Sequence, residues 1–224
     1  MRALAVVVTL LWLYPPAHVE ANPVCRWLGL CVYLSPGFQL TVVDAETGKP
    51  LSNVYGWAEW VQYGAHGRGG PLMVQNAVSA ADGRLTFPWW GPSPGSPGGL
   101  VLGIDPAVIL FKPGYGTCLV QNETALGASH HAMIRGLSRR EETFGLQPFR
   151  GTPAEWVEQL RKLVFPALSA YVSDQARDRF RELYLRRRDI AATALARLPV
   201  DTPGAAALRL GLEQDVRFFE GEQR

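Results

Sequence analysis

The ten residues 54–63, VYGWAEWVQY, decide how this sequence folds, because large and small side chains alternate along them. A period of two predicts a β-strand. One face of this strand carries Tyr55, Trp57, Glu59, Val61 and Tyr63, and the other carries Val54, Gly56, Ala58, Trp60 and Gln62. Aromatic rings on both faces mean that one face lies in a core while the other is free to pack or to bind.

Short strands are expected on either side of this stretch, at 38–43, 72–79, 85–87, 107–111, 117–121 and 144–149. Turn residues separate them, including the Asp82-Gly83 dipeptide, which is typical of a hairpin. The Gly- and Pro-rich segments 64–71 and 91–99 are expected to be loops. This spacing of strands and turns favours an antiparallel β-sandwich.

Three motifs give the sequence a family resemblance: VVDAETGKPLSNV at 42–54, ADGRLTFP at 81–88 and FKPGY at 111–115. Together they resemble the carboxypeptidase regulatory-like domain, a transthyretin-like (prealbumin-like) β-sandwich, over about residues 38–149. The resemblance implies an exported or cell-surface protein whose sandwich is not itself catalytic. Related sandwiches bind glycans or act as spacers beside an enzyme. Intradiol dioxygenases use a related sandwich with two Tyr and two His on iron, but no spacing around His130 and His131 supports such a site.

Residues 150–224 are rich in charge and poor in glycine, which indicates a helical region. Thr152 and Glu155 have the spacing of a capping box, and an apolar stripe follows up to Val164. A longer helix is expected at about 175–198 and a weaker one up to Leu212, with the segment 213–224 frayed unless Val216, Phe218 and Phe219 dock a short turn. The expected fold class is therefore mainly β with an α-helical C-terminal part: a transthyretin-like sandwich followed by a helix hairpin.

The first residues are typical of an export signal. A twelve-residue apolar run ends at Pro15-Pro16, and a small residue, Ala21, suits cleavage, so residues 1–21 are interpreted as a signal peptide and 22–37 as an N-terminal segment. Lipidation at Cys25 and retention of the apolar run as a short membrane anchor are the alternatives. We expect a periplasmic or extracellular protein that contacts the membrane only through this signal. An oxidising compartment makes Cys25, Cys31 and Cys118 disulfide candidates, with the pairing left open.

The composition excludes some classes of function. With 22 Lys and Arg against 20 Asp and Glu, the net charge of +2 argues against electrostatic capture of nucleic acid. The sequence contains no HExxH motif and no phosphate-binding loop. We therefore predict no catalytic residue, no metal ligand and no cofactor. A metal-dependent enzyme that uses His66 with His130 or His131 is a remote alternative.

Five aromatic residues are the candidate ligand-binding positions: Trp57, Trp60, Tyr63, Trp89 and Trp90. Sugar rings stack on exposed indole and phenol faces, although large aromatic side chains more often fill a core. The predicted function is a non-catalytic exported binding or structural module of the cell envelope, with an envelope protein or a glycan as its partner. A carbohydrate-binding module that uses exposed tryptophans is the alternative.

Overall fold

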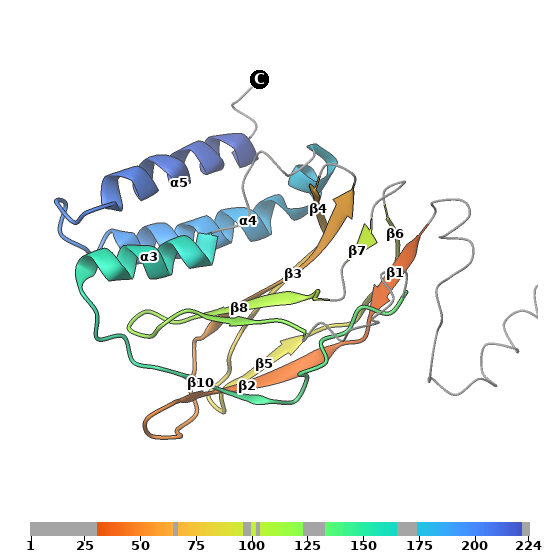
Figure 1. Ribbon diagram of the computed structural model, residues 1–224, viewed down its shortest axis with the longest axis horizontal. Helices are drawn as coiled ribbons and strands as arrows, with labels where there is room; N and C mark the ends of the chain where they lie inside the picture. Colours follow the sequence, from red (N-terminus) through yellow and green to blue (C-terminus); the bar gives the residue numbers. More distant parts are fainter. Residues whose placement is uncertain are drawn as a thin grey trace, which may run out of the picture.

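The computed structural model describes residues 31–64, 67–95, 100–101, 104–122, 133–164 and 174–220. Within these residues, three helices lie together on one side of a central sheet, and a smaller sheet lies on the other side (Figure 1). The chain is therefore a mixture of strands and helices whose sheets are mostly antiparallel.

The central sheet is built around the strand that the sequence singled out. Its strand order is β4-β3-β8-β9, and the short strand β7 also pairs with β3. The strands are β3 (Tyr55–Gly64), β4 (Gly67–Val78), β7 (Leu100–Val101), β8 (Ala107–Phe111) and β9 (Cys118–Val120). All neighbouring pairs are antiparallel. Aromatic residues occur on both faces of β3 because both faces of this sheet are covered by other elements.

Two smaller sheets complete the β-structure. One has the order β10-β2-β5, formed by β2 (Phe38–Asp44), β5 (Arg84–Phe87) and β10 (Thr143–Leu146). Strand β10 runs parallel to β2, which the antiparallel expectation did not foresee. The other pairs β1 (Val32–Ser35) with β6 (Trp90–Pro94) in antiparallel fashion.

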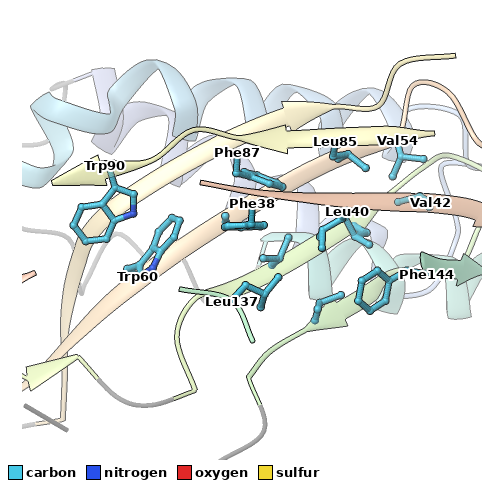
Figure 2. Close-up of a cluster of buried hydrophobic side chains, with 14 of the residues drawn as sticks. Phe38, Leu40, Val42, Val54, Trp60, Leu85, Phe87, Trp90, Leu137 and Phe144 are labelled. Carbon is cyan, nitrogen blue, oxygen red and sulfur yellow. The ribbon is translucent and has the colours of Figure 1, made fainter. Parts of the chain in front are cut away.

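The first of two apolar cores lies between the central sheet and the β10-β2-β5 sheet. It contains Ala58 and Trp60 from the even face of β3 and Val54 just before the strand, and these side chains are fully buried. Figure 2 shows Phe38, Leu40 and Val42 of β2 with Leu85 and Phe87 of β5 in the same cluster. Burial of this continuous apolar surface is the main force that holds the two sheets face to face.

The second core lies between the central sheet and the helices α3 (Pro153–Val164), α4 (Asp174–Leu195) and α5 (Ala205–Glu220). The odd face of β3 contributes Tyr55 and Trp57 to it, and α4 contributes Tyr184. The two faces of one strand therefore supply two separate cores. Among the described helices, none is long and apolar enough to cross a membrane.

The turn that follows β2 is held by one carboxylate. Asp44 Oδ1 accepts hydrogen bonds from the backbone N–H groups of Glu46 (3.0 Å) and Thr47 (2.8 Å). Asp44 Oδ2 accepts a third from the hydroxyl of Tyr115 at 2.9 Å. The motifs at 42–54 and 111–115 therefore meet in space, although about seventy residues separate Asp44 from Tyr115 along the chain.

Both segments predicted as loops contribute residues to strands. Most of 64–71 belongs to β4, and Pro71 is tolerated there because β4 is the edge strand of its sheet. The segment 91–99 supplies most of β6, in which Pro94 pairs with Val32. Residues 65–66 and 96–99 lie outside the described part of the chain.

The helical region agrees with the prediction at its start and differs at its end. The capping box is confirmed: Thr152 N–H donates to Glu155 Oε2 at 2.6 Å, and Glu155 N–H donates to Thr152 Oγ1 at 3.3 Å. The predicted frayed segment 213–224 is wrong as far as Glu220, because α5 continues to that residue. Phe219 stabilises this last part of α5 by stacking on Tyr184, with ring centroids 4.6 Å apart. Three helices, rather than a hairpin, therefore cover the sheet.

Candidate ligand pocket

A pocket of about 370 Å³ opens on the helix-facing side of the central sheet. Its lining residues follow the period of two along three adjacent strands: Trp57, Glu59, Val61 and Tyr63 from β3, Ala107 and Ile109 from β8, and Leu119 from β9. Asp105, Thr117, Gln121 and Lys162 complete the wall. This volume lies at the small end of the range seen for ligand sites.

The strand register explains why these side chains meet. Trp57 pairs with Ile109, and Ile109 pairs with Leu119, so the three side chains form one row across the sheet. Glu59 pairs with Ala107 in the next row. Because a small alanine stands opposite the glutamate, the sheet surface is hollow at this point.

Helix α3 is fixed over one edge of the pocket by hydrogen bonds to the start of β9. The backbone N–H of Thr117 donates to Gln159 Oε1 at 3.1 Å, and the Thr117 hydroxyl donates to the Gln159 carbonyl at 3.2 Å. Lys162 follows Gln159 on the same helix and lies exposed at the pocket rim. The pocket therefore has a rigid sheet floor and a helix wall.

Two carboxylates lie deep in the lining. Glu59 is 4% exposed and Asp105 is 2% exposed. Glu59 Oε2 accepts a hydrogen bond from Trp57 Nε1 at 3.5 Å, and Glu59 Oε1 accepts one from the Tyr184 hydroxyl at 3.3 Å. Buried carboxylates are rare in proteins unless cations or hydrogen-bond donors compensate them.

Buried arginines supply part of that compensation from outside the pocket lining. The guanidinium of Arg187 lies 4.4 Å from the ring centroid of Trp57, and its charge is attracted to Glu59. Burial lowers the pKa of Arg187 to about 10, with the neighbouring Arg188 adding to the effect. Arg135 is attracted to Asp105 in the same way, while its own burial lowers the pKa of Arg135.

Asn122 fixes the backbone on which Asp105 stands. Its side-chain amide nitrogen donates to the carbonyls of Asp105 (2.8 Å) and Gly136 (3.0 Å). Its side-chain oxygen accepts from the backbone N–H of Ser138 at 2.7 Å. The second carboxylate is therefore held by a network that reaches both flanking segments.

The structure separates the five aromatic residues that the sequence proposed as a binding surface. Trp57 and Tyr63 line the pocket. Trp60 and Trp90 lie in the first core, with their rings 5.2 Å apart edge to face. Trp89 is 65% exposed and is not among the pocket residues. Figure 2 shows Trp60 and Trp90 on the side of β3 that faces the β10-β2-β5 sheet.

Sequence reasoning missed the charged residues of the pocket. Glu59 lies on the same face of β3 as Trp57, and its carboxylate there makes this part of the strand polar. Asp105 stands directly before a buried strand, and only the fold shows that this position adjoins Glu59. A charged residue in an otherwise apolar strand was the one signal available.

The structure shows the bonding state of two of the three cysteines. Cys31 is disulfide-bonded, and Cys118 is a free, half-buried thiol. Cys25 lies outside the described residues. His66, His130 and His131, which a metal site would have used, also lie outside them. Among the described residues, no group of three or more His, Cys, Asp or Glu is arranged to hold a metal ion.

Comparison with known proteins gives one weak structural likeness. No family model matches the sequence, and no curated protein matches it. Among solved structures, the chain is similar to 3-chlorocatechol 1,2-dioxygenase from Rhodococcus opacus 1CP, with 16% sequence identity and a TM-score of 0.28. The match covers 61% of this chain and 69% of that chain. At this TM-score the likeness carries no argument about chemistry.

Two expectations about function are corrected. The predicted non-catalytic module of the cell envelope is withdrawn, since the solved structure reported above is an enzyme, although a TM-score of 0.28 does not assign catalysis to this chain. The alternative, a carbohydrate site on exposed tryptophans, is wrong because Trp57, Trp60 and Trp90 are at most 5% exposed. Only Trp89 presents its ring to solvent as that interpretation required.

Proposed function

We propose that the pocket over β3, β8 and β9 binds a compact organic molecule with an apolar body and a positively charged end. The observation that carries this proposal is the pair of buried carboxylates, Glu59 and Asp105, in a lining that is otherwise mostly apolar. The arginines that are attracted to these carboxylates, Arg187 and Arg135, are not among the lining residues.

The rest of the lining supports the same ligand class. Trp57, Val61 and Ile109 provide an apolar floor, which contributes to binding through the area removed from water. Ligand sites commonly combine such a floor with a few polar groups that set orientation. Lys162 is the cation of the lining and lies exposed at the rim, whereas the two charged residues in the buried part of the lining, Glu59 and Asp105, are both acidic.

The test uses three probes of similar shape and different charge: phenethylamine, phenethyl alcohol and 3-phenylpropionate. Calorimetry on the full chain is expected to show binding in the order cation, neutral, anion. A loss of roughly tenfold or more in the affinity for phenethylamine is expected in Glu59→Gln, which corresponds to about 1.4 kcal/mol. Equal binding of the three probes, or binding of none of them, overturns the proposal.

A second variant separates binding from folding. Ala107→Leu fills the hollow opposite Glu59 without changing any charge, so it is expected to abolish binding while the melting temperature changes little. Trp89→Ala is the matched control, because Trp89 is exposed and outside the pocket. Unchanged binding of phenethylamine by Ala107→Leu contradicts the assignment of the site.

We further propose that residues 38–149 form a transthyretin-like sandwich of the kind seen in carboxypeptidase regulatory-like domains. The hydrogen bond from Tyr115 to Asp44 supports this, since it joins two of the motifs that carry the resemblance. The shared core between the β10-β2-β5 sheet and the central sheet supports it as well. An experimental structure whose strand order departs from that family overturns the assignment.

We also propose that the chain is exported. The disulfide at Cys31 supports this proposal, because disulfides persist in oxidising compartments. The test is fractionation of cells that produce the full chain. Recovery from the periplasm or the medium is expected, and exclusive recovery from the cytosol contradicts export.

A further inference from the structure

A second hollow, separate from the ligand pocket, lies between α4 and α5 and has a volume of about 650 Å³. The two helices are antiparallel neighbours, since Tyr184 stacks on Phe219 while Arg188, one turn later in α4, pairs with Asp215, one turn earlier in α5. The α4 side of the hollow includes Leu185 and Ala192, together with Ala196 just after the helix. We define this hollow as the α4–α5 groove.

One face of α5 lines the groove with a regular pattern. Its residues are Arg209, Leu212, Glu213, Val216, Arg217 and Glu220. The spacing of three and four places all six on one side of the helix. Along the helix axis the charges read positive, negative, positive, negative, and Leu212 and Val216 lie between them.

This charge order is complementary to itself when it is reversed. If a second α5 lies antiparallel to the first, Arg209 faces the second copy's Glu220, and Glu213 faces the second copy's Arg217. In each pair, the two residues lie at equal distances along α5 from nearly the same point. One twofold axis through that point therefore brings both pairs together. In a parallel arrangement like charges would face each other, which is destabilising.

We infer that the α4–α5 groove is occupied by a second copy of this chain, in a twofold dimer whose two α5 helices lie antiparallel. Each α5 then fills the groove of the other copy, and the two α4–α5 pairs form a four-helix bundle. A twofold interface requires a surface that is complementary to itself, and the face of α5 meets this requirement in both charge order and apolar positions. The geometry resembles the antiparallel packing common in four-helix bundles.

The first experiment measures the mass of the full chain by light scattering after size exclusion, at up to about 100 μM, where an association with micromolar Kd is nearly complete. A dimer is expected, with twice the mass of one chain. A monomer at every concentration overturns the inference.

Charge redesign tests the geometry. A basic chain carries Glu213→Arg with Glu220→Arg, and an acidic chain carries Arg209→Glu with Arg217→Glu. Each is expected to be monomeric alone, because like charges would face each other across the twofold axis. An equimolar mixture is expected to form a heterodimer, a result that a defect in folding could not produce. Failure of the mixture to associate contradicts a dimer built on this face of α5.

Two further variants keep the test specific to the groove. Ala196→Glu places a charge at an exposed position of the groove, and it is expected to give a monomer with unchanged circular dichroism. The matched control exchanges two exposed α4 charges outside the groove, with Arg181→Glu and Glu182→Arg. The control is expected to remain a dimer, and loss of its dimer would place the interface elsewhere.

Discussion

Arg187 of α4 lies with its guanidinium over the indole ring of Trp57, 4.4 Å from the ring centroid, in the second core. Its Nε donates to the carbonyl of Leu163 at the end of α3. The adjacent Arg188 donates to the carbonyl of Val164 at 3.1 Å and pairs with Asp215 of α5 at 2.6 Å. Two neighbouring arginines of one helix therefore connect all three helices, and Arg187 also reaches the central sheet.

Replacement of Arg187 by methionine keeps an apolar stem but removes the buried cation. We expect the free energy of unfolding to fall by about 3–5 kcal/mol, since Glu59 loses a nearby compensating charge and the Leu163 carbonyl loses its donor. Urea denaturation measures the change. Arg186→Met is the control, because Arg186 is exposed and should cost less than about 0.5 kcal/mol.

Phe219 tests whether the end of α5 is part of the folded core. The side chain is 1% exposed and stacks on Tyr184, so Phe219→Ala is expected to destabilise the protein by about 3–5 kcal/mol. Phe218→Ala is the neighbouring comparison, and it should cost less because Phe218 is only half-buried. A negligible effect of Phe219→Ala in thermal unfolding would mean that the last turns of α5 are frayed in solution.

We expect the contribution of Asp44 to the free energy of unfolding to be lost at acidic pH. Hydrogen bonds from the Thr47 backbone and the Tyr115 hydroxyl lower the pKa of Asp44 below its ordinary value. Because the pKa is lower in the folded state, this stabilisation is complete above the ordinary pKa of an aspartate and is lost as the pH falls through the folded value. The stability difference between wild type and Asp44→Asn should therefore be larger at neutral pH than at strongly acidic pH. A difference that stays constant with pH would exclude ionisation of Asp44 as its cause.

The state of the three cysteines predicts how many of them can be alkylated before and after reduction. The chain has three cysteines, of which Cys31 is disulfide-bonded and Cys118 is free. Burial raises the pKa of the Cys118 thiol, so alkylation should be slow in the native protein and faster after denaturation. Mass spectrometry is expected to find one alkylated cysteine in the denatured, unreduced chain and three after reduction. Three sites before reduction would contradict the disulfide.

Local patterns predicted those features that depend on neighbouring residues. The alternation in 54–63 predicted β3 and its two packed faces, and the Thr152 and Glu155 pair predicted the start of α3. The six other strands predicted from the sequence are present, with shifts of a few residues at their ends. These features depend on periodicity and capping, which a single sequence carries.

Features that depend on distant partners could not be predicted. Strand β6 is rich in glycine and proline and forms because β1 pairs with it. The last turns of α5 are stabilised by Tyr184, which belongs to another helix. The candidate pocket requires Glu59 and Ala107 to be opposite each other, and that register follows from the whole sheet.

The parallel pairing of β10 with β2 has a consequence for biosynthesis. Thr143 pairs with Thr41, so the edge of the β10-β2-β5 sheet stays incomplete until about one hundred further residues have left the ribosome. The helices that cover Trp57 emerge later still, since α3 begins at Pro153 and α5 ends at Glu220. A nascent chain therefore exposes the face of β3 that carries Trp57 until the helices have been synthesised. Such an apolar surface is a natural binding site for chaperones until the last helix packs on it.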